Sequence, residues 1–130
     1  CTPHQGELRG MGGETADDWR TRADLVGEFA ADLGHLLLVK GPYDVASDGE
    51  TTRVNRTGNP AMTVGGTGDV LAGVTGALAC VLPPLQAASV AAYATGSAGD
   101  AAAATAGDGL LATDLPDRLP AALRDPEGRE

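Results

Sequence analysis

Apolar residues recur at helical spacing in the first third of the chain and stop at a glycine. The positions are Trp19, Ala23, Val26, Phe29, Ala30 and Leu33, followed by Gly34. Because residues three and four apart share one face of an α-helix, the pattern predicts an amphipathic helix packed on a core. Thr15 is the expected N-cap, with acidic residues 17 and 18 in the first turn, and Gly34 is the expected end. Trp19 and Phe29 are expected to anchor the core.

The strand predictions come from a short apolar run and a turn signal. Residues 36–39 are continuously apolar, which is typical of a parallel strand covered on both faces. Residues 43–47 and 51–55 flank an Asp-Gly pair, which indicates a β-hairpin. Residues 1–7 are expected to be the end of a strand. Pro3 would end the strand pairing, and Gly6 would allow the chain to turn.

The second half of the chain predicts helices separated by proline and glycine. Helical spacing runs from Gly68 to residue 81, where a Pro-Pro pair forbids continuation. Gly73 and Gly76 weaken this helix and would be tolerated where a backbone or ligand lies close, as in a buried helix behind a functional loop. An Ala-rich helix is expected over 85–104, with Asp100 facing water.

A short terminal helix is predicted next. Thr113 is its expected cap, with Asp114 in the first turn and Pro116 early enough to be accommodated. The polar residues 125–130 are expected to be a frayed tail, so that 1–124 form the folded part.

Composition narrows the function class. The 130 residues carry a net charge of −9, and Lys40 is the single lysine. An acidic chain without basic patches argues against a nucleic-acid partner, and no apolar stretch is long enough for a membrane span. The acidity favours a halophilic source, and a generic acidic cytosolic protein fits nearly as well. The first residue is not Met, which suggests a sequence that begins within a longer protein.

Two cysteines and the absence of a signal peptide bear on location. Cys1 and Cys80 have no metal-ligand spacing, which favours a reduced intracellular chain over a disulfide scaffold. A cytoplasmic location is the resulting expectation.

A glycine-rich stretch before the helix at 68 is the strongest candidate for chemistry. Gly65, Gly66, Thr67 and Gly68 can bring backbone N–H groups close to an anion, at the positive end of the helix dipole. Asp69 adds a group that can accept a proton from a bound hydroxyl. A simple glycine turn is about as probable on the loop alone, and Asp69 can also be a helix N-terminal acid that favours the dipole.

Three segments resemble one known family. The run Asn-Pro-Ala-Met-x-x-Gly-Gly-Thr-Gly-Asp-Val-Leu-Ala-Gly at 59–73 resembles the signature of the ADP/ATP-dependent NAD(P)H-hydrate dehydratases, in the ribokinase-like superfamily. Thr-Pro-His-x-Gly-Glu at 2–7 and the segment at 38–44, a strand end followed by Lys-Gly, resemble two further motifs of the family, in the family's order. The resemblance covers the chain to about residue 123 and implies the C-terminal half of a three-layer α/β/α domain.

The resemblance also implies roles for individual residues. Asp69 would be the catalytic base and contact the substrate, and His4 would help bind the substrate. The nucleotide-binding positions would be Lys40, Gly41, Pro42, Tyr43, Asp44 and Gly68. Pro42 to Asp44 differ from the smaller residues and Thr often found in the family, which weakens the assignment of adenosine contacts. No residue is expected to be a dedicated metal ligand.

The implied reaction repairs a damaged cofactor. Hydrated NADH or NADPH would be dehydrated after phosphoryl transfer from ADP or ATP, with Mg²⁺ bridging the nucleotide phosphates and ADP favoured for a prokaryotic source. One alternative is a ribokinase-like kinase of a vitamin precursor. Another is a non-catalytic nucleotide-binding fragment that needs its missing N-terminal half. A lone half is expected to associate with that half or with copies of itself, because unpaired strand edges are adhesive.

Overall fold

The computed structural model describes residues 1–124 and divides the chain into two compact units, Cys1–Asn55 (unit 1) and Arg56–Glu130 (unit 2). The expected frayed tail, 125–130, lies outside the described residues. Within residues 1–124, no helix is long and apolar enough to cross a membrane.

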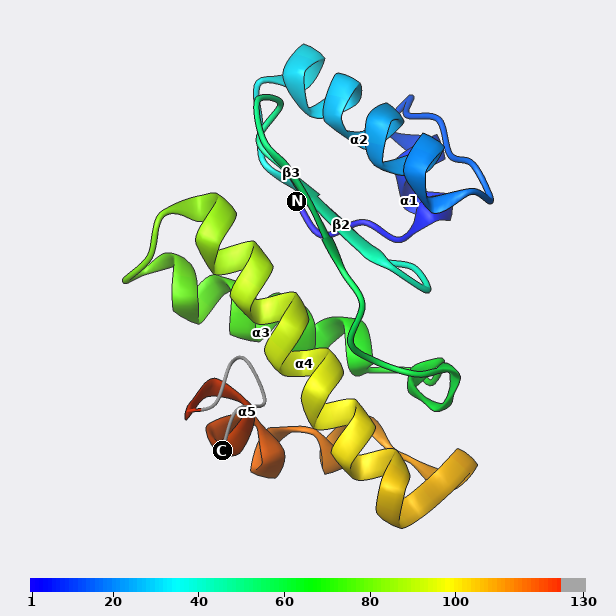
Figure 1. The fold of residues 1–130 in the computed structure, drawn as a ribbon, viewed down its shortest axis with the longest axis vertical. Helices are drawn as coiled ribbons and strands as arrows, with labels where there is room; N and C mark the ends of the chain where they lie inside the picture. The colour runs from blue at the N-terminus through cyan, green and yellow to red at the C-terminus, as the bar shows by residue number, and fades with distance from the viewer. Residues whose placement is uncertain (125–130) are drawn as a thin grey trace. The chain divides into compact units, whose positions relative to one another are not determined.

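Unit 1 is built on an antiparallel three-stranded sheet in the order β1-β2-β3 (Figure 1). The strands are β1 (Leu37–Val39), β2 (Asp44–Ser47) and β3 (Thr52–Asn55), and the expected hairpin joins the last two. Asp48 Oδ1 accepts the N–H groups of Glu50 and Thr51, and Gly49 has φ 92°, so the Asp-Gly turn forms for the expected reasons.

Strand β1 is buried at all three positions, as expected, but its regular pairing with β2 is antiparallel. A parallel neighbour exists on its other side, where the N-terminal segment runs alongside. Leu38 N–H donates to Cys1 O and Lys40 N–H to Pro3 O, each at 2.9 Å, and His4 forms an isolated parallel bridge with Lys40.

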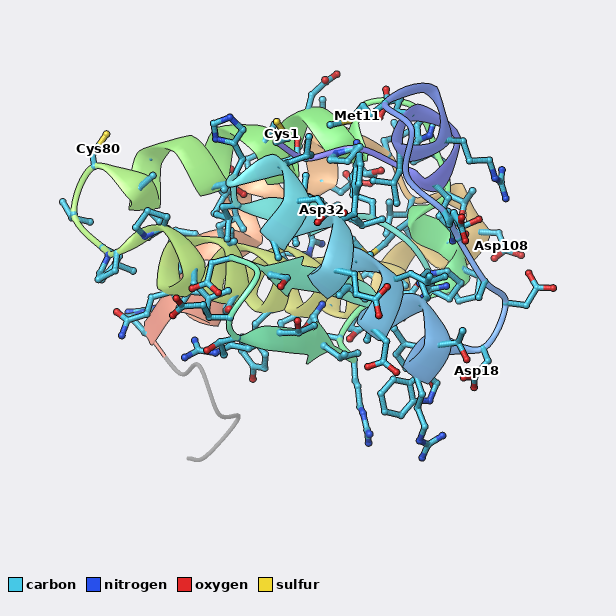
Figure 2. The ribbon with its side chains drawn as sticks, turned by 90° about the horizontal axis from the view of Figure 1, so that it is seen from above. Cys1, Met11, Asp18, Asp32, Cys80 and Asp108 are labelled. Carbon is cyan, nitrogen blue, oxygen red and sulfur yellow. The ribbon has the colours of Figure 1, made fainter. Side chains whose placement is uncertain are left out.

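Two helices complete unit 1, and the first was not predicted. Helix α1 (Gln5–Gly10) begins directly after His4, so Gly6 lies inside a helix and not in a turn. Helix α2 (Trp19–Leu33) ends at Gly34 in the left-handed conformation, as expected. Its N-cap is Asp18 (Figure 2), whose carboxylate accepts Thr21 N–H at 2.8 Å. The expected cap, Thr15, instead accepts a hydrogen bond from Arg9.

The core of unit 1 lies between α2, α1 and the sheet. Its buried apolar members are Leu8, Ala23, Val26, Ala30, Leu37, Val39 and Val45. Burying one such leucine or valine side chain contributes about 1.5–3 kcal/mol. Phe29 packs against this cluster while partly exposed, and Trp19 is also only partly buried, so small aliphatic residues fill the centre and the aromatic anchors lie at its margin.

Unit 2 contains two long helices packed against each other, α3 (Thr67–Ala79) and α4 (Pro84–Ala106) (Figure 1). A one-turn 3₁₀-helix, η1 (Pro60–Met62), precedes α3. Cys80 is exposed at the end of α3, in the turn before α4 (Figure 2). The chain ends in η2 (Gly107–Gly109), η3 (Ala112–Asp114), η4 (Pro116–Arg118) and α5 (Leu119–Arg124).

Two expectations for unit 2 are wrong, and a third, that Asp100 faces water, is confirmed but incomplete. Gly73 and Gly76 are exposed, and a Cβ at either would meet nothing within 4 Å, so α3 is not the buried helix expected. Thr113 is not a helix cap; Asp114 instead accepts Leu111 N–H at 2.8 Å within a run of short 3₁₀ turns. Asp100 is exposed but does not merely face water, because it binds Gly58 and Asn59.

Candidate functional site

His4 is held by a reciprocal pair of hydrogen bonds at the start of α1. Glu7 N–H donates to His4 Nδ1 at 3.0 Å, and His4 N–H donates to Glu7 Oε2 at 2.8 Å. This is a capping box in which histidine stands where serine or threonine is usual. A Cβ on Gly6 would lie 3.0 Å from His4 Cε1, so glycine leaves room for the ring. The Thr-Pro-His-x-Gly-Glu segment therefore has a local structural role.

The hydrogen bond from Glu7 N–H determines which nitrogen of the His4 ring is the acceptor. Nδ1 accepts a hydrogen bond and so carries no proton, which places the ring proton on Nε2. Nε2 lies 3.5 Å from Glu7 Oε1, and the His4 side chain is 59% exposed. His4 N–H lowers the pKa of the Glu7 carboxyl, because it stabilises the charged form. His4 thus presents an exposed N–H donor in a fixed orientation.

The second group of predicted residues forms a tight turn at the end of β1. Gly41 N–H donates to Asp44 Oδ1, and Asn55 Nδ2 donates to Asp44 Oδ2, both at 3.2 Å. Both carboxylate oxygens therefore serve the turn. Burial raises the pKa of the Asp44 carboxyl despite these hydrogen bonds, because burial disfavours the charged form. The structure brings His4 and Lys40 together in the isolated bridge beside this turn.

Arg22 supports this turn from α2 and was missed from the sequence. Its side chain is 3% exposed, and its Nη2 donates to Tyr43 O at 2.9 Å. The Tyr43 ring contacts Trp19 with 6.1 Å between ring centroids, and Arg20 lies over Trp19 at 4.3 Å. The signal in the sequence was an arginine on the otherwise apolar face of the predicted helix, one position before Ala23.

The glycine-rich loop lies in unit 2, at the start of α3. Gly66 is the N-cap with φ 97° and ψ −17°, a conformation that strongly favours glycine. Gly65 is exposed and has no such requirement. Thr67 Oγ1 donates to Met62 O at 2.9 Å and lies 3.1 Å from Val64 O, so its hydroxyl fastens the loop to the preceding turn.

The N-terminus of α3 presents donors and one acid. Within residues 1–124, the N–H groups of Thr67 and Gly68 have no hydrogen-bond partner, and these donors stand at the positive end of a 13-residue helix. Asp69 follows in the first turn with an exposed side chain, whose carboxylate also makes no hydrogen bond within that range. Two backbone N–H donors are thus followed directly in the chain by a possible proton acceptor.

The described residues do not build a resident magnesium site. Within residues 1–124, no group of three or more His, Cys, Asp or Glu side chains lies together as a set of metal ligands. Hard divalent cations need several oxygen ligands, and residues 1–124 supply no such cluster.

Comparison with known proteins agrees with the motifs. The NAD(P)H-hydrate dehydratase family model matches residues 1–121. The bifunctional NAD(P)H-hydrate repair enzyme Nnr of Pyrobaculum aerophilum is 50% identical over 125 residues, which cover 95% of this chain and 25% of that protein. The ADP-dependent (S)-NAD(P)H-hydrate dehydratase of Cenarchaeum symbiosum is 46% identical over 125 residues, covering 95% of this chain and 44% of that protein.

A solved structure gives the same result. The ADP/ATP-dependent NAD(P)H-hydrate dehydratase from Bacillus subtilis, co-crystallized with ATP/Mg²⁺, matches with a TM-score of 0.82 and 34% identity over 95% of this chain and 46% of that chain. The chain thus spans between a quarter and a half of the length of these proteins. The expected α/β, ribokinase-like fold class is confirmed by this similarity. The chain belongs to the NAD(P)H-hydrate dehydratase family.

Proposed function

We propose that this chain is part of an ADP-dependent dehydratase that restores NADH and NADPH from their hydrated forms. The observation that carries the proposal is the start of α3, where two N–H donors without partners in residues 1–124 directly precede an exposed Asp69. Phosphoryl transfer needs fixed donors around the phosphate oxygens and a base beside the attacking hydroxyl, and this loop offers both.

Asp69 is the proposed base in the first step. Its carboxylate accepts the proton of the ring hydroxyl while that oxygen forms a bond to the terminal phosphorus of ADP, and the bond from this phosphorus to the bridging oxygen breaks to release AMP. In the second step the carbon–oxygen bond of the phosphate ester breaks, a neighbouring ring carbon loses a proton, and inorganic phosphate leaves. The ring double bond of the reduced nicotinamide is thereby restored.

Unit 1 supplies the other proposed contacts. His4 would donate its Nε2 hydrogen to the hydrated nicotinamide nucleotide, since the capping box leaves that donor exposed. The turn from Lys40 to Asp44 would bind the adenine nucleotide, with Gly41, Pro42 and Tyr43 as exposed positions. Asp44 and Arg22 form hydrogen bonds within this turn, so their proposed role is to maintain its conformation.

Magnesium and the rest of the protein enter the proposal separately. We expect Mg²⁺ to arrive bound to nucleotide phosphates, because the described residues form no metal-ligand cluster of their own. We also expect full activity to depend on further chain, supplied by a longer protein or a partner, because this chain spans at most about half of its matched relatives. A cytoplasmic location and a saline source remain proposals from composition.

The test is recovery of the reduced-nicotinamide absorbance when the protein meets hydrated NADH, Mg²⁺ and either ADP or ATP. We expect recovery with ADP, and a loss of at least about a hundredfold in kcat for Asp69→Asn, because a positioned base contributes about 10²–10⁴. ADP affinity should be unchanged in that variant. If the protein instead consumes nucleotide with a vitamin-precursor alcohol as the acceptor, and restores no absorbance with hydrated NADH, the kinase alternative is supported. Equal turnover by Asp69→Asn and wild type would refute the assignment of the base.

A further inference from the structure

The segment at 57–62 lies in close contact with α4, and two glycines of α4 make that contact possible. A Cβ on Gly96 would lie 2.7 Å from the carbonyl carbon and oxygen of Thr57, and one on Gly99 would lie 2.7 Å from Met62 Cγ and Cε. Both distances are shorter than real Cβ contacts allow. Positions 96, 99 and 100 share one face of the helix, so this face accepts the segment along a full turn.

Asp100 holds the middle of the same segment through two hydrogen bonds. Its Oδ2 accepts Gly58 N–H at 3.0 Å, and its Oδ1 accepts from Asn59 Nδ2 at 2.8 Å. The amide of Asn59 is thereby oriented, and its own Oδ1 accepts Ala61 N–H at 3.1 Å, which caps η1. A charged acceptor forms stronger hydrogen bonds than a neutral one, so Asp100 fixes both the backbone and the cap.

The same segment is hydrogen-bonded directly to the glycine-rich loop at 65–68, which we call the anion loop because we propose that it binds the nucleotide phosphate. Thr67 Oγ1 donates to Met62 O, the last residue of η1, and lies 3.1 Å from Val64 O. A continuous set of hydrogen bonds therefore leads from Asp100 through Asn59 and η1 to Thr67. Thr67 carries one of the two donors proposed to meet the phosphate. A change at Asp100 must alter the position of these donors unless another contact replaces it.

We propose that Asp100 is a positioning residue for the anion loop at 65–68, acting through Asn59 and η1. The inference rests on the proposed function, because it assigns Asp100 to the loop that would bind the nucleotide phosphate. In the sequence, the signal was the only charged side chain in the 23 residues of α4. A charged side chain on an Ala-rich helix is usually solvated, whereas Asp100 accepts two hydrogen bonds from the segment at 57–62.

The hydrogen-bond chemistry of the pair supplies a test with internal rescue. In Asp100→Asn, one oxygen can still accept Gly58 N–H, but the new NH₂ faces the NH₂ of Asn59. In Asn59→Asp, two carboxylates meet at about the 2.8 Å that separates the present partners. In the double exchange, Asn59→Asp with Asp100→Asn, all three hydrogen bonds can form again, because donor and acceptor have simply changed places.

The sign of the effect separates positioning from simple electrostatics. Removing a carboxylate from a chain with net charge −9 should tighten the binding of an anion, because it reduces the Coulomb repulsion between them. Positioning predicts weaker binding. Asp108→Asn is the matched control, because Asp108 is an exposed acid of the same unit, just beyond α4 (Figure 2), and its side chain makes no hydrogen bond within residues 1–124.

The experiment measures ADP and inorganic phosphate affinity by calorimetry, and amide hydrogen exchange at 58–68, for all variants below their Tm. Asp100→Asn should weaken ADP binding roughly tenfold and speed exchange at 65–68. The double exchange should return both within about twofold of wild type, and Asp108→Asn should change neither in that direction. Unchanged exchange at 65–68 in folded Asp100→Asn, or no recovery in the double exchange, would overturn the inference. If wild type binds neither probe, the proposal that the loop at 65–68 of this chain binds the nucleotide phosphate fails, while the exchange data still decide the role of Asp100.

Discussion

Replacing Gly66 with alanine tests the loop geometry on which the proposed site depends. Gly66 has φ 97°, where a side chain is strained, and its Cβ would lie 2.9 Å from the Cβ of Ala112. A residue held in a sparsely populated backbone region costs about 1–3 kcal/mol, and the contact with Ala112 adds to this cost. We therefore expect Gly66→Ala to lower the free energy of unfolding by about 2–3 kcal/mol.

Two further variants separate the sources of that loss. Gly73→Ala lies on the same helix, where a Cβ meets nothing within 4 Å, and should raise stability by about 0.5–1 kcal/mol through helix propensity. The double variant Gly66→Ala with Ala112→Gly removes the contact but keeps the backbone strain. Any stability that it recovers relative to the sum of the single variants measures the contact.

Urea unfolding followed by circular dichroism is the appropriate assay. The only tryptophan, Trp19, lies in unit 1, so its fluorescence would not report directly on α3. ADP affinity should fall together with stability in Gly66→Ala and remain unchanged in Gly73→Ala. Wild-type stability in Gly66→Ala would show that the loop does not adopt this conformation in solution, and the argument for its phosphate-binding donors would fail with it.

The remaining predictions concern pH and salt. Because the pKa of Glu7 is lowered from 4.5, its carboxylate stabilises the fold above pH 4.5, and this stabilisation is lost as the pH falls through the lowered pKa. In urea unfolding, Glu7→Gln should therefore lose less stability in acid than wild type. Parallel plots of stability against pH for the two proteins would contradict the capping box. Because burial raises the pKa of Asp44 from 3.8, the neutral carboxyl stabilises the fold below pH 3.8, and this stabilisation is lost as the pH rises through the raised pKa. On acidification, wild type should therefore gain stability relative to Asp44→Asn. A loss of stability relative to that variant would refute the burial argument. With a net charge of −9, the Tm should rise between about 0.1 and 1 M KCl, as the screening length falls from roughly 10 to 3 Å, and a constant Tm would count against a saline adaptation.

Elements defined by local signals could be predicted from the sequence. The hairpin has an Asp-Gly turn whose side-chain hydrogen bonds span two and three residues, and α2 ends at a glycine that adopts a left-handed conformation. The spacing of apolar residues located all four ends of α3 and α4 to within two residues. Helix α1 was missed because it is six residues long, contains two glycines, and is capped by histidine, which is not a usual capping residue.

Features that depend on distant partners could not be predicted in this way. Asp100 binds Gly58 and Asn59, which lie more than 40 positions earlier in the chain. No local sequence pattern distinguishes it from a solvated acid. The same limit applies to glycines in helices. Gly73 and Gly76 were expected to lie against a neighbour and do not, whereas Gly96 and Gly99 permit the contact with 57–62. Sequence shows that a glycine weakens a helix, but only the fold shows which one is needed for packing.

The structure also separates, within the recognised segments, the residues that have a local structural role from those that do not. In the segment at 2–7, the hydrogen bonds of the capping box account for His4 and Glu7, and the space beside the ring accounts for Gly6. In the loop at 65–69, backbone conformation accounts for Gly66 and two carbonyl contacts account for Thr67. Asp69 has no such contact within residues 1–124, and its dipole interaction alone is worth only about 0.3–1 kcal/mol. An acid with so small a structural contribution, beside two N–H donors without partners in that range, supports our proposal that Asp69 is the residue that acts on the substrate.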